Sequence, residues 1–427
     1  MFRLLLAFAI GLALFEATIR SLNLRQMLRH GRHIPPGFET ALDDSLMTKM
    51  SAYGADRGRL SLCSNLSIQV LIIIAVFGGA FEHYDRWISQ LTHAPVAQGV
   101  LYCLFASWTF AVITIPFELY GHFVIEQHHG FNRSSVGLYW SDFVKGLALT
   151  SLFVSILAAC ALYLIQWSTR AWWVWVWAFL LVFELFVTLV APRLIEPLFM
   201  KVKPLHNQAL VEDISAMAAR AGVRVDRILQ VDASRRSGHT NAYFTGIGPV
   251  KRVVLFDTLL EKLDHKEILA VLAHELGHWK LRHVMQSFAL FQGFTLAACY
   301  GAFRLINWEP LPGVVGAVNA SFLMRATITL FIGSLVATCL TPCMNAWSRR
   351  NEWQADKYAC SLVEPGDLAS GLVKLCKDNL ANLYPHALYA AFYGTHPTTV
   401  ARVQQLKGAQ ALHSLSQQEL SVDLRRS

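Results

Sequence analysis

Charged residues are scarce in this chain of 427 residues, making up only 15% of it, whereas a soluble globular protein carries about 25%. Hydrophobic residues make up 54%, and they are concentrated in long runs with few or no charges. A run of about 20 such residues is long enough to cross a lipid bilayer as a helix. The shortage of charge therefore argues against an ordinary soluble domain and predicts an integral membrane protein.

Cysteine is present, but not in the spacings that would give it a structural or catalytic role. The eight cysteines are scattered, mostly in or beside the apolar runs, and no CxxC pair occurs. This excludes a secreted-type disulfide framework, so we interpret them as reduced, apolar fillers. Basic runs interleaved with exposed aromatic residues are also missing, so no nucleic-acid partner is predicted despite the formal net charge of +8.

Seven apolar runs are long enough to serve as membrane spans. Most of the basic residues near the first run, residues 2–19, follow it, which favours an uncleaved span over a secretory signal peptide. The other runs cover about residues 62–81, 97–119, 146–167, 171–191, 284–306 and 320–340. We therefore expect an N-terminal membrane domain of five spans at residues 1–191, and a second domain at residues 192–427 that contains two further spans.

The basic residues are divided unevenly between the two sides of this bundle. With seven spans, only five of the 37 Lys and Arg residues fall on the side of the N-terminus: Arg3, Arg86, Arg170, Arg304 and Arg325. Because cytoplasmic loops are rich in Lys and Arg, the N-terminus is expected outside and the C-terminus inside. A bacterial inner membrane is the favoured location, with the endoplasmic reticulum as the alternative in a eukaryote.

Polar side chains interrupt several apolar runs, among them Glu16, Gln69, Glu184 and Gln292. A carboxylate that faces lipid costs about 2–3 kcal/mol, so these side chains should face protein or a wet interior. Hydrogen bonding between helices is the favoured interpretation, and a direct role in chemistry is the alternative.

The segment between the fifth and sixth spans has the pattern of a small α/β unit. A helix is expected over residues 207–221, and β-rich runs cover residues 227–231, 241–247 and 252–256, with a Gly- and Pro-containing turn at 246–249. Asp264, with Glu267 three residues later, forms a capping-box pattern at the start of a further helix. That helix should lead almost directly into the sixth span, which places it close to the membrane surface.

This last helix contains the most informative motif, His274-Glu275-x-x-His278. Residues four apart share a helical face, so both imidazoles can reach one metal ion while Glu275 lies one position round the helix. The pattern is that of a zinc site whose water is activated by a carboxylate. Five residues are a short pattern, so the interpretation needs support from elsewhere in the chain.

A catalytic zinc site needs a third protein ligand and one open position. The spacing of a third metzincin histidine is absent, because the next histidine is His283. The better candidate is Glu352, which follows the seventh span and shares a helical face with Asp356. Asp356 could accept a hydrogen bond from a ligand imidazole. A solvated acidic face is the alternative for this pair.

The chain after this pair is expected to break at Pro365-Gly366, with Asp367 capping another helix to about residue 380. A turn follows around His396, and Arg402 lies six residues beyond it. The tail from Ser414 is polar and expected to be loose.

Together these motifs resemble the type I CAAX prenyl protease family of membrane zinc endopeptidases. The motifs that carry the resemblance are Phe123-Val-Ile-Glu-x-x-His-Gly-Phe-Asn132, Pro192-x-x-Ile-x-Pro-Leu-Phe199, Ser237-Gly-His-Thr-Asn-Ala-Tyr-Phe244, Val254-Leu-Phe-Asp-Thr-Leu259, His274-Glu-Leu-Gly-His278, Asn351-Glu-Trp-Gln-Ala-Asp356 and His396-Pro with Arg402. The resemblance covers nearly the whole chain. It departs at Thr398, where a second proline is usual, and at Met200-Lys-Val-Lys203, and neither departure touches a candidate ligand.

The resemblance implies that His274, His278 and Glu352 bind one Zn2+ per chain, with Glu275 as the general base. Asp356 would then hold a ligand imidazole through a hydrogen bond.

The resemblance also implies that His396 and Arg402 lie near the metal and the substrate. A cation or imidazole there could stabilise the oxyanion of the tetrahedral intermediate. For His396, packing within the turn before proline is the alternative. Asn241, Ala242 and Tyr243 would belong to an edge strand to which an extended substrate adds by backbone pairing, and an ordinary core strand is the alternative.

The expected fold is mainly α: a polytopic membrane protein with seven transmembrane helices plus a zincin-like cytoplasmic protease domain containing a small β-sheet. The expected function is cleavage of peptide bonds near the C-terminus of CAAX-type, prenylated proteins or peptides, so partners are lipid-linked or membrane-embedded chains and the bilayer itself. One alternative is a zinc protease for quality control of non-prenylated membrane proteins. Another is a non-enzymatic seven-span transporter or receptor with structural zinc, which would need four protein ligands and no free base.

Overall fold

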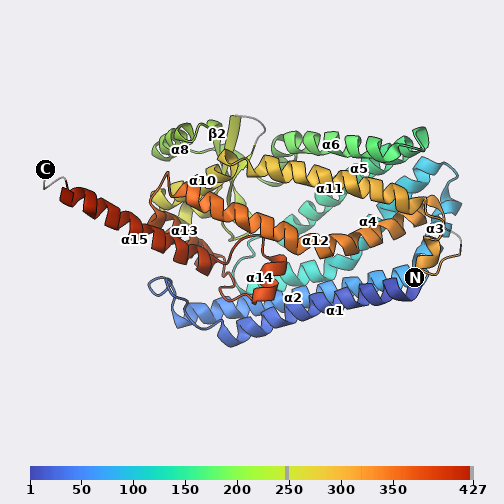
Figure 1. Cartoon of the computed structure of the whole chain (residues 1–427), viewed down its shortest axis with the longest axis horizontal. Helices are drawn as coiled ribbons and strands as arrows, with labels where there is room; N and C mark the ends of the chain where they lie inside the picture. Colours follow the sequence, from blue (N-terminus) through green and yellow to red (C-terminus); the bar gives the residue numbers. More distant parts are fainter. Residues whose placement is uncertain (246–249, 319, 424–427) are drawn as a thin grey trace.

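The computed structural model describes residues 1–245, 250–318 and 320–423. Figure 1 shows long helices running along one axis of the molecule, with the strands and shorter helices gathered toward one end. Among the described residues, seven helical segments are long and apolar enough to cross a membrane. The mainly helical, seven-span fold expected from the sequence is thereby confirmed.

The seven segments are longer than the apolar runs that predicted them, because their polar ends continue the same helical hydrogen-bond ladder. They are α1 (Phe2–His30), α2 (Asp44–Phe77), α4 with η1 (Pro95–Tyr120, Gly121–Glu126), α5 (Val136–Trp167), α6 with η2 and α7 (Trp172–Val190, Ala191–Ile195, Glu196–Phe199), α11 (His283–Ile306) and α12 (Phe322–Ala359). Short α3 (Ala80–Leu91) and η4 (Pro312–Val314) lie in the connections between spans.

Two of the polar pairs within the spans join neighbouring helices. Gln69 Nε2 on α2 donates to Glu16 Oε2 on α1 at 2.8 Å. Gln292 Nε2 on α11 donates to Glu184 Oε2 on α6 at 2.6 Å. Interhelical hydrogen bonding, the favoured interpretation of these residues, is confirmed for both pairs.

Among the described residues the sheet has four strands, β1 (Val202–Pro204), β2 (Arg224–Val231), β3 (Ala242–Thr245) and β4 (Val250–Phe256), in the order β1-β2-β4-β3. β2 and β4 are parallel, and the other two pairs are antiparallel. β1 escaped prediction because it has three residues and ends in a proline, which gives no alternating pattern. β3 lies at the edge, as expected. The turn predicted at 246–249 lies outside the described residues.

Shorter helices cover the sheet and complete this end of the molecule. They are α8 (Gln208–Arg220), η3 (Ala233–Arg235), α9 (Asp257–Lys262), α10 (His265–Lys280), α13 (Pro365–Asp378), α14 (Ala387–Tyr393) and α15 (Thr399–Asp423). One continuous cluster of buried apolar side chains joins α8, the inner strands and α10, with Ile214, Leu255 and Leu272 fully buried in it. This core fixes α10 against the sheet, so the motif-bearing helix rests on a rigid base.

Two expectations for the C-terminal part were wrong. Pro365 does not break the chain but occupies the first turn of α13, where proline is favoured because its missing N–H would be unpaired anyway. The N-cap is therefore Glu364 and not Asp367. The tail is helical rather than loose, since α15 continues to Asp423.

Candidate active site

The start of α10 is held by the capping box that the sequence predicted. The backbone N–H of Glu267 donates to Asp264 Oδ1 at 3.0 Å, and the N–H of Asp264 donates to Glu267 Oε2 at 2.9 Å. The buried Glu267 side chain also accepts hydrogen bonds from Ser370 Oγ at 2.6 Å and Lys374 Nζ at 2.7 Å. The cap therefore fixes the first turn of α10 to α13.

The other end of α10 is pressed against α12 through Gly277. A Cβ added to Gly277 would lie 3.0 Å from the Cα and the carbonyl oxygen of Ala355 and 3.3 Å from the ring of Tyr358. Only glycine permits so close an approach of the two backbones without a shift. The approach brings His274 and His278 on α10 to face Glu352 on α12.

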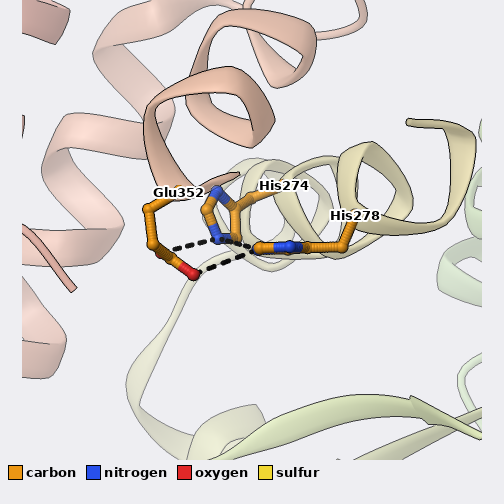
Figure 2. A group of neighbouring side chains, drawn as sticks. All are labelled: His274, His278 and Glu352. Carbon is orange, nitrogen blue, oxygen red and sulfur yellow. Dashed lines mark hydrogen bonds and ion pairs between the residues drawn. The ribbon is translucent and has the colours of Figure 1, made fainter. Parts of the chain in front are cut away.

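These three side chains converge on one point (Figure 2). His278 Nε2 lies 3.2 Å from His274 Nε2 and 3.2 Å from Glu352 Oε1, and His274 Nε2 lies 3.4 Å from Glu352 Oε2. Glu352 Oε2 is buried and accepts no hydrogen bond from any residue that the structure describes. Two imidazole nitrogens and a buried, unsatisfied carboxylate oxygen form the donor set of a metal with nitrogen and oxygen ligands, so the residues present fit such an ion. In the described part of the chain, no other group of three such ligands occurs.

Asp356 and Arg402 position the imidazole of His274 through its Nδ1 side, which faces away from Glu352. Asp356 Oδ1 lies 2.8 Å from His274 Nδ1, which fixes the Nδ1–H tautomer and turns Nε2 toward Glu352. The buried guanidinium of Arg402 donates to both oxygens of Asp356, at 2.6 and 2.8 Å. Arg402 Nη1 also lies 3.5 Å from Glu352 Oε2. Its shortest hydrogen bonds are therefore with a carboxylate that orients a candidate ligand.

The second imidazole is held by a pair that the sequence did not reveal. His283 Nδ1 lies 3.2 Å from His278 Nδ1, and His283 Nε2 lies 2.9 Å from Gln354 Oε1. Because Gln354 Oε1 can only accept, His283 carries its proton on Nε2, and its Nδ1 accepts from the Nδ1–H of His278. The Nε2 lone pair of His278 then faces Glu352.

A break in the helix makes this hydrogen bond possible. α10 ends at Lys280, and Arg282 adopts the left-handed conformation with φ of 59° before α11 begins at His283. α10 therefore leads almost directly into the sixth span, as expected, with two residues between the helices. This link places His283 Nδ1 within hydrogen-bond distance of His278 Nδ1. The only signal in the sequence is the polarity of His283 and Gln354 beside apolar spans, and no local rule connects the two.

Glu275 and His396 complete a pocket of about 410 Å3 beside the three converging side chains. Burial raises the pKa of Glu275, although the neighbouring imidazoles of His274 and His278 work in the opposite direction. His396 Nε2 lies 3.4 Å from Glu352 Oε1, and its side chain is 60% exposed at the mouth of the pocket. A raised carboxyl pKa brings Glu275 closer to the neutral range in which a general base works.

The candidate substrate strand borders the same pocket. Asn241 and Ala242 line it, and Asn241 is exposed. Tyr243 is not among the lining residues, because its hydroxyl donates to Glu196 Oε1 at 2.9 Å on the other side of the strand. The outer edge of β3 has no strand partner in the described part of the chain. Its backbone groups are thus available beside the converging ligands.

Comparison with known proteins places these features in a family. Residues 23–201 match the family model described as CAAX prenyl protease N-terminal, five membrane helices, and residues 204–410 match peptidase family M48. The chain is 30% identical over 430 residues to the human CAAX prenyl protease 1 homolog, covering 90% of each protein. The homolog of Dictyostelium discoideum is 36% identical over 321 residues, covering 73% of this chain and 74% of that protein. The crystal structure of S. mikatae Ste24p is similar with a TM-score of 0.87 and 26% identity, covering 94% of this chain and 97% of that one.

Proposed function

We propose that this chain is a zinc endopeptidase acting near the C-terminus of CAAX-type substrates. The reason is that it belongs to peptidase family M48 and carries the membrane helices of the CAAX prenyl proteases. The chain is a multi-pass membrane protein and a metalloprotease by family. One observation carries the proposal: two Nε2 atoms and a buried carboxylate oxygen without a hydrogen bond converge beside Glu275 and a free strand edge. No structural role explains all of these together.

In the proposed site, His274, His278 and Glu352 would hold the ion, one per chain. Zinc supplies a Lewis acid that polarises a carbonyl and makes a nearby water more acidic. Asp356 and the His283–Gln354 pair keep the two imidazoles in the tautomers that leave Nε2 free.

Glu275 is the proposed general base. Its carboxylate takes the proton from the attacking water and delivers it to the departing amine nitrogen. His396, at the pocket mouth, would donate to the oxygen that becomes negative as the carbonyl is attacked. Arg402 contributes through Asp356 and through its positive charge near Glu352, rather than as a free oxyanion donor.

The substrate backbone would extend along the edge of β3. Asn241, Ala242 and Tyr243 present their backbone groups there, and pairing with them would hold a peptide extended past the ligands. Support comes from the exposure of Asn241 and from the position of β3 at the sheet edge. The Tyr243 side chain has a different task, since it ties the strand to α7 through Glu196.

The domain boundary and the orientation in the membrane belong to the same proposal. We divide the chain between residues 191 and 192, with the N-terminus outside and the site on the cytoplasmic side. The uneven distribution of Lys and Arg supports this orientation. Lipid-linked substrates are consistent with a site carried by the extension of a membrane span, and membrane-embedded chains without a prenyl group are the alternative.

A purified Glu275→Gln variant tests the chemistry. It should bind the metal like the wild type but cleave peptides at least about 100-fold more slowly, because a positioned general base contributes about 10²–10⁴-fold. Cleavage at the wild-type rate would overturn the proposal. A paired set of prenylated and unprenylated peptides on the wild-type protein then decides between CAAX processing and general proteolysis. Insensitivity to chelator would exclude both kinds of zinc protease.

A further inference from the structure

A second cavity lies next to the active-site pocket. It has a volume of about 990 Å3, which corresponds to a sphere about 12 Å across, and Asn379 lines both spaces. Residues of α1 and α2, including Arg20, Arg57 and Ser61, line it from the membrane helices. The wall formed by these two helices therefore faces a space adjacent to the active-site pocket.

Arg20 on that wall makes no ion pair in the described part of the chain. Its Nη1 donates to Ser61 Oγ at 2.9 Å and its Nη2 to Asn65 Oδ1 at 3.4 Å, both neutral groups on α2. Among the described residues no carboxylate lies within 4.0 Å of it, and its buried Nε makes no hydrogen bond. Glu16, one turn away on α1, accepts from Gln69 through its Oε2, and both Glu16 and Arg20 lie near the hydroxyl of Tyr393. Arg20 is a half-buried cation at the end of the first apolar run whose hydrogen-bond partners are neutral, so it can still bind an anionic group.

Among the lining residues, the wall formed by α1 and α2 carries two arginines and no carboxylate. Arg57 lies one turn before Ser61 on α2, and its side chain is 53% exposed and 3.4 Å from Glu126. Glu126 is already engaged by Tyr53 Oη at 2.8 Å and lies 3.3 Å from His239 Nε2. Glu118, the other carboxylate that lines the cavity, belongs to α4 and makes no ion pair with Arg20 or Arg57. The wall formed by α1 and α2 therefore suits an anion.

The surroundings of Arg20 also connect this wall with the catalytic side. The guanidinium lies over the ring of Tyr393, 4.4 Å from its centroid, at the end of α14. His396 follows Tyr393 by three residues in the chain, and its Nε2 lies 3.4 Å from Glu352 Oε1. Three residues span at most about 10 Å. A short stretch of chain thus leads from Arg20 to the proposed metal ligands.

We propose that Arg20, supported by Arg57, binds the free carboxylate at the C-terminus of the peptide substrate. This inference rests on the proposed function, in which the bond to be cut lies near the end of the chain. A CAAX box has four residues, so at most about three follow the scissile bond and reach about 10 Å in extended form. That reach is comparable with the width of the cavity. Arg20 would then select a bond by its distance from the chain end.

The test compares two forms of one peptide, with a C-terminal carboxylate or a C-terminal amide. For the wild type, kcat/KM should be about tenfold to 100-fold higher for the acid, mostly through KM, because a charge-assisted hydrogen bond is missing in the amide. Arg20→Gln should cleave the acid as slowly as the amide, with the amide itself unaffected. Arg25→Gln is the matched control, since Arg25 is exposed on the same helix and should preserve the preference.

Several outcomes would overturn the inference: equal cleavage of acid and amide by the wild type, or an undiminished preference in Arg20→Gln. If Arg20→Gln does not fold, Arg20→Lys and Arg57→Gln replace it, and each should reduce the preference. Binding of both peptides to the Glu275→Gln protein measures the same preference without catalysis. This binding test therefore remains valid even if the proposed function is wrong. An anionic lipid headgroup is the other source of such chemistry. In that case phosphatidylglycerol in the vesicles would change the cleavage rate of the wild type but not that of Arg20→Gln, and the wild type would cleave acid and amide equally well. This result would also refute the inference.

Discussion

Replacing Gln354 by leucine should weaken metal binding although Gln354 touches no metal. In the wild type its Oε1 keeps the proton of His283 on Nε2, so that Nδ1 of His283 can accept from His278. Leucine has a similar volume but accepts nothing. His283 can then adopt the other tautomer, with its proton on Nδ1. The Nδ1–H groups of His283 and His278 would then face each other across 3.2 Å and repel. His278 relieves this by moving its own proton to Nε2, where it blocks coordination.

The expected size of the effect follows from the hydrogen bond that the substitution removes. That bond orients a ligand imidazole, and removing a partner of this kind reduces metal affinity about 10- to 100-fold. This corresponds to about 1.4–2.7 kcal/mol of binding free energy. Competition with a fluorescent chelator on purified protein measures it directly. Gln354→Glu is the matched control, because its carboxylate still accepts from His283 Nε2, and it should bind the metal at least as tightly as the wild type.

Two results would refute this reasoning. Unchanged affinity in Gln354→Leu would show that His283 does not determine the tautomer of His278. An equal loss in Gln354→Glu would point to packing at this position rather than to the hydrogen bond. The thermal midpoints of the metal-free proteins should agree within a few degrees, and a large drop in the leucine variant alone would also assign the effect to folding.

Three further predictions concern α10. Gly277→Ala should lower the free energy of unfolding by about 1–3 kcal/mol and weaken metal binding, because its Cβ would push against the Ala355 backbone at 3.0 Å; thermal unfolding with wild-type stability would contradict this close approach. Asp264→Ala should cost about 1 kcal/mol through loss of the cap, while Asp264→Asn, which keeps an accepting oxygen, should cost less; equal effects would argue against the cap. Metal affinity should depend on pH: burial opposes the charged form of His274, but Asp356 and Glu352 outweigh it and raise the pKa of His274 to about 9 in the metal-free protein. Below that pH binding must displace a proton, so affinity should fall about tenfold per pH unit as the pH decreases and level off above about 9, and a flat profile between about pH 6 and 9 would contradict the pairing.

The sequence predicted what local rules govern. The spans followed from apolar length, the start of α10 from its capping box, and the common face of His274 and His278 from helical periodicity. Glu352 could be nominated as a partner because a third ligand was chemically required and Glu352 shares a helical face with Asp356. Its approach to α10 depends on Gly277, a packing detail between two helices far apart in the chain.

The sequence could not predict interactions that depend on an unusual turn or on the packing of one helix against another. His283 reaches His278 only through the left-handed residue Arg282, a conformation that non-glycine residues adopt rarely. Arg20 looked like one more basic residue flanking the first span, and only the packing of α1 against α2 places it on a cavity wall beside neutral partners. The hydrogen bond from the Tyr243 hydroxyl to Glu196 is of the same kind, since it joins the edge strand to a helix that lies far from it in the chain.

The three converging side chains are separated in the chain by a pair of membrane helices. His274 and His278 precede α11, and Glu352 lies on the single helix α12 that also forms the last span. During biosynthesis the two histidines therefore emerge first, and the carboxylate joins them only after both helices have been inserted and α12 has returned the chain to the same side. A nascent or truncated chain has an incomplete donor set. Proteolytic capacity in this molecule is consequently a late product of assembly, reached when membrane insertion is complete.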